Sequence, residues 1–425
     1  MLIEFYGRNF GCFRDEFRLS MLAADIDPDS ERGIVEVKVN GDDEPLRLLR
    51  CAAIYGPNAS GKSTVLRAAS ALGFLLSSSA DQQSDEPLGP FEPFLLEGSS
   101  LRDPVKLGIR AVIHGGVFEY QIEFDQTQYL TENLSEITPV DRLILFERRG
   151  EDVTGAWSSN ERFELISGSF RPNALLLSLA DRLAPKLAQG IAVGFRRLLG
   201  YYDTTWPMPS RYSARLAAHR ACKDKTGFGR WMLGWIKDAD LGVVGYDAQE
   251  LPVPSEDVDK SSDQPPGARR PTEFELTFLH AGSRGPVQLP YSRESMGTHK
   301  LVALTPYIHD LVRGGQGRTY FIDEIGASLH PHLFEGLLRH FNCEIEPESV
   351  RGQLIFATHE TAMLDTEAKN ATLRRDQVYF TEKDVTGGSR LYSLAEFKER
   401  NNLNLRRRYL QGRYGALPSL GQFGD

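Results

Sequence analysis

The sequence predicts an α/β protein with a β-rich N-terminal lobe, a mostly parallel core sheet and a helical insertion. An apolar strand, a glycine-bearing loop and a helix follow one another over residues 48–72, and strand and helix patterns alternate again over residues 272–359. These patterns suggest four regions: an N-terminal lobe over 1–170, a helical insertion or lid over 171–245, a C-terminal lobe over 246–385 and a basic tail over 386–425.

Composition limits the class of protein. The 425 residues are 41% hydrophobic and 25% charged, as in an ordinary globular protein. A net charge of −9 argues against a surface that is basic throughout, although a local basic groove stays open. Four separated cysteines without a CxxC pair suggest reduced thiols rather than a zinc site or disulfides. Without a signal-peptide start or a run of about eighteen apolar residues, we expect a cytoplasmic protein with no membrane contact.

Short β-favouring segments form the predicted N-terminal lobe. Residues 2–6 and 17–24 are apolar and residues 33–39 alternate, so we expect an antiparallel ribbon at the start of the chain. Two alternating runs meet at a Gly-Gly pair within residues 105–125 and predict a hairpin. The lobe before the insertion is therefore expected to be mainly β-structure.

Helical spacing follows over residues 174–199, 209–223 and 227–238, which we expect to form an all-helical insertion. Residues 251–271 are rich in proline, serine and charge and predict a flexible loop or linker. After this loop the segments TEFELTFL, THKLVALTPYIHDLV, RTYFIDE and GQLIFATH alternate between strand and helix patterns. They predict the strands and a helix of a mostly parallel sheet.

Residues 56–63 spell GPNASGKS, which satisfies the P-loop pattern GxxxxGK[ST] between an apolar strand and a helix. Backbone N–H groups of such a loop surround phosphate oxygens, helped by the positive end of the following helix. Lys62 is expected to reach the β- and γ-phosphates of ATP, and Ser63 to bind Mg²⁺. The alternative is a chance glycine-rich turn. The predicted nucleotide contacts are Gly56, Pro57, Asn58, Ala59, Ser60, Gly61, Lys62, Ser63 and Thr64.

Polar residues also end two strand patterns of the C-terminal lobe. Asp323 and Glu324 follow an apolar run, so both are expected at the carboxyl edge of a central strand, where α/β sheets bind ligands. Asp323 is predicted to hold Mg²⁺ through water, and Glu324 to activate the attacking water as general base. His359, after the strand pattern QLIFAT, could contact the γ-phosphate and that water. The alternatives are a solvated carboxylate pair and a structural histidine.

The order of P-loop, carboxylate pair and strand-end histidine resembles the ABC-type ATPases. In YSRESMGTHKLVAL, Ser295, Gly297 and Lys300 resemble a divergent form of their signature loop, Ser-x-Gly-x-x-Lys. In that family the loop of one subunit closes on the γ-phosphate held by another, which implies an ATP-dependent dimer of heads. The alternative is a helix cap by Ser295. GASLHPHL resembles the loop that links the two active sites, with Ser328 and His330 as candidates.

Two further family features bear on the N-terminal lobe. The family has a glutamine that senses Mg²⁺ after the P-loop helix, but Gln82 and Gln83 lie in a loose polar stretch, and this residue is left unassigned. The opening LIEFYGRNFGCFRDEFRLSML resembles the first strand of the SMC/RecF/OLD-like heads of recombination and chromosome-maintenance proteins. Arg14 is therefore a candidate neighbour of the adenine.

A narrower resemblance rests on FRDEFRLSMLAA, RRDQVYFTEKD and YLQGRYGALP, which look like the abortive-infection ATPases of the AbiL/RloA type, with the PARIS ATPase a relative. It implies a sensor or scaffold in an antiphage system that controls a separate effector encoded alongside, such as a nuclease. A built-in nuclease domain of the OLD type is not expected, because residues 360–425 fall short of the roughly hundred residues of a small domain. The acidic run at 257–259 lies in the loop.

The C-terminal segment leaves two interpretations open. Its basic residues with interleaved tyrosines could contact DNA, RNA or an acidic partner, or the segment could be a solvated helix face that docks on its own domain. Among functions, the alternatives are a DNA-repair ATPase of the RecF/SMC type that clamps DNA, which the lack of long heptads weakens, and a transporter subunit. The residues concerned are Lys398, Arg400, Arg406, Arg407, Arg408, Tyr409, Arg413 and Tyr414.

Overall fold

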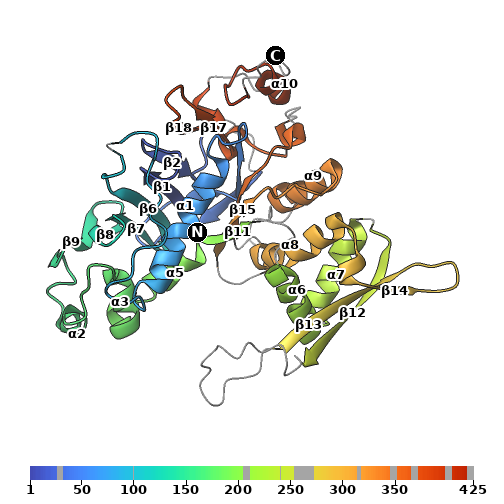
Figure 1. The fold of residues 1–425 in the computed structure, drawn as a ribbon, viewed down its shortest axis with the longest axis horizontal. Helices are drawn as coiled ribbons and strands as arrows, with labels where there is room; N and C mark the ends of the chain where they lie inside the picture. Colours follow the sequence, from blue (N-terminus) through green and yellow to red (C-terminus); the bar gives the residue numbers. More distant parts are fainter. Residues whose placement is uncertain are drawn as a thin grey trace. The chain divides into compact units, whose positions relative to one another are not determined.

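The computed structural model divides the chain into two compact units (Figure 1). Unit 1 comprises Met1–Tyr202, Leu311–Ile325 and Glu335–Asp425, and unit 2 comprises Asp203–Asp310 and Gly326–Phe334. The residues described are 1–25, 32–98, 100–203, 211–239, 241–252, 272–313, 317–344, 352–364, 372–397 and 404–418.

A seven-stranded antiparallel sheet forms one layer of unit 1, in the order β10-β9-β8-β7-β6-β1-β2. Its strands are β1 (Leu2–Arg8), β2 (Phe17–Ser20), β6 (Val105–Ile113), β7 (Gly116–Phe124), β8 (Tyr129–Ile137), β9 (Arg142–Arg149) and β10 (Asp152–Thr154). The antiparallel pairs β1–β2 and β6–β7 confirm the start of the predicted ribbon and the predicted hairpin. β3 (Ile34–Val37) pairs instead with β4 (Leu46–Leu49) in a two-stranded sheet.

The core sheet of unit 1 has six strands in the order β11-β15-β16-β5-β17-β18. They are β5 (Cys51–Tyr55), β11 (Gly200–Asp203), β15 (Arg318–Asp323), β16 (Gly352–Ala357), β17 (Val378–Lys383) and β18 (Ser389–Ser393). β15, β16, β5 and β17 pair in parallel, and β18 is antiparallel to β17. The predicted mostly parallel core sheet is therefore confirmed. Because parallel strands end at the same edge, the residues that follow β5, β15 and β16 lie at one edge of the sheet.

Helix α1 (Lys62–Ser78) packs between these two sheets, contacting β6 on one side and β15 and β16 on the other. The apolar face predicted for this helix is buried, with Val65, Leu66, Ala69 and Leu72 at 0% exposure. Helices α3 and α5 also contact α1. The other α-helices of this unit are α2 (Glu164–Ser167), α3 (Leu176–Leu183), α4 (Pro185–Ala188), α5 (Ile191–Arg197) and α10 (Leu405–Leu410), and α9 (Pro331–Arg339) begins in unit 2 and ends in unit 1.

A buried carboxylate fixes the start of α3. Glu132 on β8 accepts hydrogen bonds from the backbone N–H groups of Leu176 and Leu177, at 2.6 and 2.9 Å. Its Oε2 lies 3.7 Å from a guanidinium nitrogen of the buried Arg148. Burial raises the pKa of Glu132, and the charge of Arg148 opposes that shift. Breaking this pair would leave a charge inside the protein, which is costly.

Unit 2 combines helices with its own sheet. The antiparallel strands β12 (Val243–Pro252), β13 (Thr272–His280) and β14 (Val287–Pro290) lie in the order β12-β13-β14. Helices α6 (Arg211–Lys223) and α7 (Phe228–Asp238) contact β12, and α8 (Met296–Arg313) lies mostly in this unit. Arg220 on α6 forms an ion pair with Asp310 on α8 at 2.7 Å.

Two expectations about organisation differ from this structure. The segment TEFELTFL lies in β13, antiparallel to β12, and so is not a strand of the parallel core sheet. The insertion expected over 171–245 does not coincide with a unit, because α3–α5 belong to unit 1 and unit 2 continues through its own sheet. Periodicity identifies an element but not the core it joins. Most of the loop predicted over 251–271, with its acidic run at 257–259, lies outside the described residues.

The described parts of the C-terminal segment, 386–397 and 404–418, pack on the core of unit 1. Strand β18 extends the core sheet, and Tyr409 and Tyr414 are 5% and 2% exposed. Both rings stack on Phe380 of β17, with centroids 5.2 and 5.7 Å away. Docking on the chain's own domain is therefore the correct interpretation for the tyrosines. Residues 398–400 lie outside the described part of the chain. Within the described part, no helix has the length and apolarity needed to cross a membrane.

Candidate nucleotide-binding site

The loop between β5 and α1 has the backbone geometry of a phosphate cradle. Gly56 and Gly61 have φ of 153° and 113°, and Ala59 has φ of 59°. A Cβ on Gly61 would lie 2.9 Å from Cys12 Sγ and the Phe13 ring, so a larger residue does not fit there. Gly61 is also the N-cap of the 17-residue helix α1. The first N–H groups of this helix and its positive dipole end therefore lie at the loop, which favours an anion.

Lys62 lies within this cradle. Its Nζ donates to the carbonyl oxygens of Gly56 and Pro57, at 2.9 and 3.0 Å, and the residue is only 5% exposed. Burial lowers the pKa of the Lys62 amine, and the negative charges of Glu324 and Asp323 oppose the shift. The charges that oppose the shift belong to the last residue of β15 and the residue that follows it.

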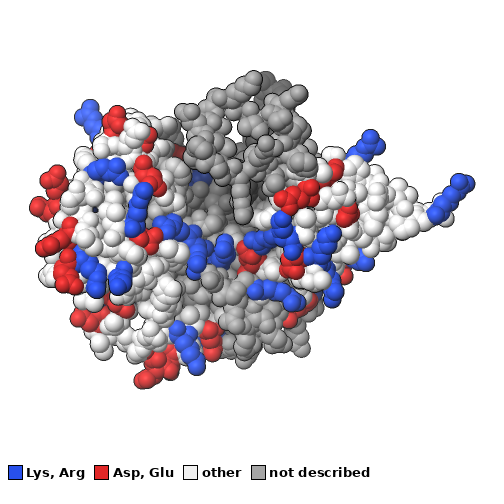
Figure 2. Space-filling model, turned by 90° about the horizontal axis from the view of Figure 1, so that it is seen from below, with Lys and Arg blue, Asp and Glu red and all other residues white. Residues whose placement is uncertain are grey.

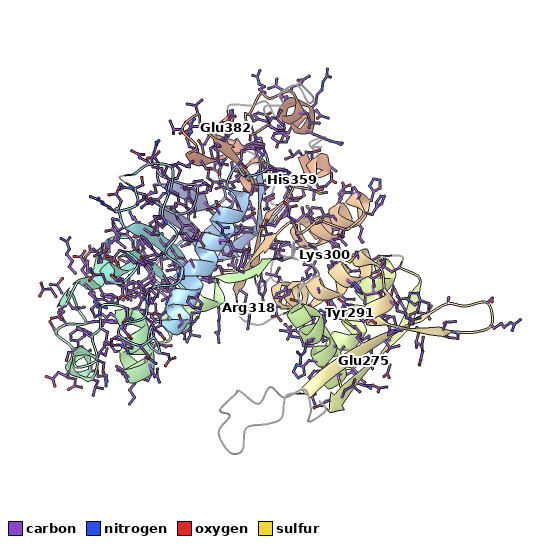
Figure 3. The ribbon with its side chains drawn as sticks, in the orientation of Figure 1. Glu275, Tyr291, Lys300, Arg318, His359 and Glu382 are labelled. Carbon is purple, nitrogen blue, oxygen red and sulfur yellow. The ribbon has the colours of Figure 1, made fainter. Side chains whose placement is uncertain are left out.

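Glu324 and His359 form the closest pair at this edge. His359 Nε2 lies 3.2 Å from Glu324 Oε1, although the two residues follow the ends of different strands, β16 and β15. His359 is labelled in Figure 3. Glu324 has φ of 47°, an unusual value for a residue other than glycine that places it just beyond the strand. Strained backbone of this kind often occurs at functional sites. The predicted grouping of Lys62, Asp323, Glu324 and His359 is thus present within unit 1.

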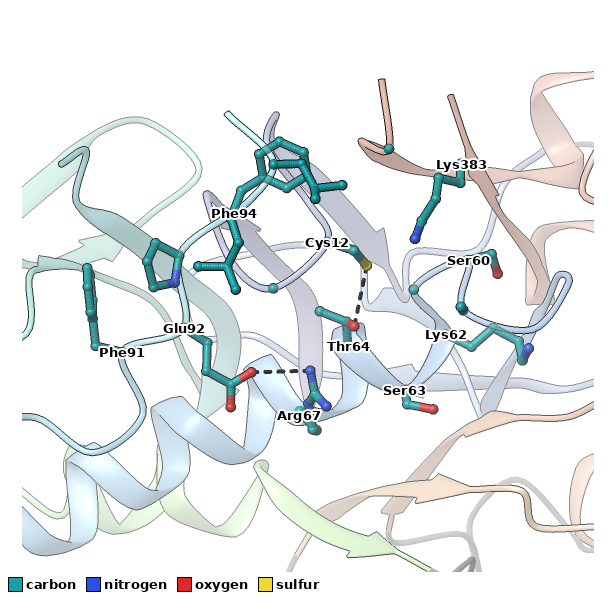
Figure 4. Close-up of a pocket in the computed structure, with 17 residues that line it drawn as sticks. Cys12, Ser60, Lys62, Ser63, Thr64, Arg67, Phe91, Glu92, Phe94 and Lys383 are labelled. Atoms are coloured by element: carbon teal, nitrogen blue, oxygen red, sulfur yellow. Dashed lines mark hydrogen bonds and ion pairs between the residues drawn. The ribbon is translucent and has the colours of Figure 1, made fainter. Parts of the chain in front are cut away.

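A cavity of about 690 Å³ adjoins the P-loop (Figure 4). Arg67 on α1 pairs with Glu92 at 3.2 Å, and Cys12 lies 3.4 Å from the Thr64 hydroxyl. The cavity is large enough for a small ligand. Its lining beyond the P-loop and the start of α1 is Gly11, Cys12, Arg67, Phe91, Glu92, Pro93, Phe94, Leu95, Leu96, Lys383 and Gly387.

Sequence reasoning missed most of this lining. The apolar residues of 91–96 follow α1 in a segment without strand or helix pattern, and Lys383 lies at the end of β17. Arg14, the residue expected near adenine, forms ion pairs with Asp15 and Glu97 at 3.1 and 3.5 Å. No pattern in the sequence brings these segments together, because only the folded lobe places them beside the P-loop.

The residues predicted to hold Mg²⁺ suit that ion. Ser63 lies in the first turn of α1, and the Asp323 carboxylate ends β15 with 4% exposure. Hydroxyl and carboxylate oxygens are the hard ligands that Mg²⁺ prefers, and the ion usually keeps several waters or binds phosphate as well. Across the described residues no group of three or more His, Cys, Asp or Glu side chains could hold a metal. Water and substrate phosphate would have to complete the coordination.

The predicted signature residues lie in unit 2 at the start of α8. Ser295 Oγ accepts the Thr298 backbone N–H at 3.1 Å, so the helix-cap role left open for Ser295 is present. Ser295 is exposed, whereas Lys300 is only 3% exposed. A Cβ on Gly297 would lie 3.1 Å from the carbonyl oxygen of Ser328, which brings the two predicted dimer loops together. The ring of His330, in the same loop, contacts that of His332 with centroids 5.4 Å apart.

The two glutamines considered as Mg²⁺ sensors lie elsewhere. Gln82 and Gln83 follow the C-terminal end of α1, and at 1.5 Å per residue this helix places them about 25 Å from its start. Their backbone carbonyls accept hydrogen bonds from Arg171 and Asn173, at 2.8 and 2.5 Å. These contacts hold the segment at the far end of the helix, so neither glutamine reaches the P-loop.

The fold and the site define a P-loop protein of the α/β class. Residues 51–365 match the sequence model of the family described as "AAA domain, putative AbiEii toxin, Type IV TA system", and the chain belongs to this family. Its α/β fold with a P-loop supports a nucleotide-binding ATPase domain. The SMC head domain from Thermotoga maritima is similar in structure, with 14% sequence identity, a TM-score of 0.40, and coverage of 92% of this chain and 98% of that chain. No curated protein matches the sequence.

Proposed function

We propose that this protein binds ATP at the P-loop and hydrolyses it with Mg²⁺. The proposal rests on the position of the Glu324–His359 pair at the carboxyl edge of the core sheet. The P-loop follows β5 at the same edge, and the Lys62 amine lies within this loop, under the influence of the Glu324 charge. The cavity beside Thr64 and Arg67 would take the nucleoside. Mg²⁺, when bound, would neutralise phosphate charge, and Ser63 and Asp323 have the oxygen atoms suited to hold it.

The side chains then divide the work. Lys62 would exchange its two backbone carbonyl partners for phosphate oxygens, which an ammonium binds more strongly. Glu324 would accept a proton from the attacking water, because its carboxylate lies at the sheet edge beside the cradle. His359 would hold that carboxylate in place through the 3.2 Å contact before the reaction, and would then turn the same N–H toward developing negative charge.

The direct test compares Lys62→Ala with Lys186→Ala, which removes an exposed lysine from α4. ATP binding is measured by isothermal titration calorimetry and hydrolysis by phosphate release. We expect Lys62→Ala to lose both and Lys186→Ala to match the wild type. Normal ATP affinity in Lys62→Ala would refute the phosphate role of this lysine.

We also propose that two copies assemble on ATP, with Ser295 and Gly297 of one copy facing the γ-phosphate bound by the other. Support comes from the exposure of Ser295 and from the close approach of Gly297 to the Ser328 loop. Light scattering should show a doubled mass with ATP in a Glu324→Gln protein, whose bound nucleotide persists. Adding Ser295→Arg should keep the protein monomeric while ATP binding continues. If the Glu324→Gln protein without Ser295→Arg binds ATP and stays monomeric, the proposed assembly on ATP is contradicted.

At the cellular level we propose a nucleotide-dependent sensor or scaffold in the cytoplasm that controls a separate effector, such as a nuclease encoded alongside, during phage infection. The description of the family as a putative toxin of a toxin–antitoxin system supports a role in growth control or defence, without naming the AbiL/RloA or PARIS type. Phage challenge of cells carrying the gene with its neighbours tests this. Protection that is lost in Lys62→Ala supports the role, and equal plaque counts with and without the genes contradict it.

The DNA-clamping alternative gains less from the structure. The tyrosines of the basic segment are buried in the chain's own core instead of being available for bases. On the face shown in Figure 2, basic and acidic side chains of the described residues are interspersed, in keeping with the net charge of −9. Nucleic acid is therefore not part of the proposed function.

A further inference from the structure

A buried pair of hydroxyl groups lies beneath the P-loop. Ser60 Oγ and Thr381 Oγ1 are 2.6 Å apart, and the two residues are 1% and 0% exposed. Thr381 belongs to β17, whose Phe380 pairs with Tyr55 at the end of β5. The parallel pairing therefore places the next residue of β17 directly beside the first residue of the loop.

Thr381 is packed closely against the cradle. A Cβ on Gly56 would lie 2.5 Å from both the carbonyl oxygen and Oγ1 of Thr381. The absence of a side chain at Gly56 thus lets β17 approach the P-loop backbone. This contact brings a residue 321 positions from Ser60 in the sequence into the wall of the phosphate site.

The hydroxyl protons cannot satisfy every contact at once. Ser60 Oγ is 2.8 Å from the Pro57 carbonyl oxygen, and Thr381 Oγ1 is 3.3 Å from the Tyr55 carbonyl oxygen. Each hydroxyl donates a single proton. Either Thr381 donates to Ser60 and Ser60 to Pro57, or Ser60 donates to Thr381 and Thr381 to Tyr55. The pair therefore has two hydrogen-bonding states.

The position of the Lys62 amine determines which of the two hydrogen-bonding states the Ser60–Thr381 pair must adopt. Lys62 Nζ donates to the same Pro57 carbonyl at 3.0 Å. When the ammonium turns to a phosphate, this carbonyl loses its charged donor and keeps the Ser60 backbone N–H, 3.3 Å away, and the weaker hydrogen bonding disfavours the change. The Ser60 hydroxyl is the neighbouring group that can replace the lysine, and it can do so while accepting a hydrogen bond from Thr381.

We propose that Thr381 is a positioning residue for the nucleotide site: its hydroxyl donates to Ser60, so that Ser60 donates to Pro57 when Lys62 moves to phosphate. This inference rests on the proposed binding of ATP. It assigns to β17 a part in triphosphate binding through the loop rather than through contact with the ligand. Loss of the hydroxyl would weaken binding and leave the groups that act on bound ATP in place.

The test compares Thr381→Ala with Thr381→Ser, which both remove the methyl group and differ only in the hydroxyl. Removing one hydrogen bond of ordinary strength should raise the KM and Kd for ATP about threefold to tenfold in Thr381→Ala. Thr381→Ser should remain within about twofold of the wild type, and kcat should be nearly constant in both. If Thr381→Ala instead damaged the fold, kcat would fall as well, and Thr381→Ser would not restore the wild-type values.

Ser60→Ala provides a second route if Thr381→Ala does not fold, because it removes the other hydroxyl of the pair. Its Kd should rise by a similar factor, and the double variant Ser60→Ala/Thr381→Ala should be no weaker than Ser60→Ala alone. Equal affinities of Thr381→Ala and Thr381→Ser, or fully additive losses in the double variant, would overturn the inference. A wild-type protein that binds no ATP would instead refute the proposed function.

Discussion

Replacing Glu324 by Gln is expected to slow ATP hydrolysis strongly while ATP remains bound. The substitution preserves the length of the side chain and an oxygen that can face His359, 3.2 Å away in the wild type. It removes the group able to take a proton from water. Loss of a general base reduces rates by about 10²–10⁴-fold. This factor corresponds to about 2.7–5.4 kcal/mol of activation free energy.

The assay measures kcat by phosphate release at saturating Mg²⁺ and ATP, and Kd by calorimetry. Glu151→Gln, in the exposed turn between β9 and β10, is the matched control and should leave both values unchanged. In Glu324→Gln we expect kcat to fall and Kd to change by less than about tenfold, since Lys62 still binds the phosphates. A kcat equal to that of the control would refute the assignment of Glu324 as general base.

Three other changes test separate parts of the account. Asp323→Asn should raise the Mg²⁺ concentration for half-maximal hydrolysis about ten- to a hundredfold, because an amide is a weaker partner for a hydrated cation. An unchanged Mg²⁺ titration would argue against a metal role for Asp323. His359→Ala should lower kcat about a hundredfold in phosphate-release assays, because a donor to developing negative charge is lost. Turnover equal to that of the wild type would show that the histidine has only a structural role. Glu132→Gln should reduce the free energy of unfolding by about 3–5 kcal/mol in urea titrations, because Arg148 loses its buried charge partner. An unfolding midpoint and slope equal to those of the wild type would contradict the stabilising role of this pair.

The sequence predicted the parts of the site that local pattern determines. The loop GPNASGKS lies between a strand and a helix, and Asp323, Glu324 and His359 each end or follow an apolar strand pattern. Parallel strands share a carboxyl edge, so these three local patterns together predict one site. The pairing of β15, β16 and β5 then accounts for the contact between Glu324 and His359.

The remaining features depend on tertiary structure. β13 has the alternation of many strands, but its antiparallel partner and its place in unit 2 come from packing. The cavity lining of 91–96 has no periodic pattern, and Thr381 looks like any other strand residue until β17 pairs beside the P-loop. The tyrosines at 409 and 414 are buried because Phe380 offers a surface for stacking, which no local pattern reveals.

A crystal structure with Mg²⁺ and a slowly hydrolysed ATP analogue tests the central claim most directly. We expect the triphosphate in the loop from Gly56 to Ser63, with Lys62 moved from the Pro57 carbonyl to phosphate and the γ-phosphate facing Glu324 and His359. Analogue bound elsewhere on the protein, or a γ-phosphate remote from Glu324 with Lys62 still on the carbonyl oxygens, would contradict the account.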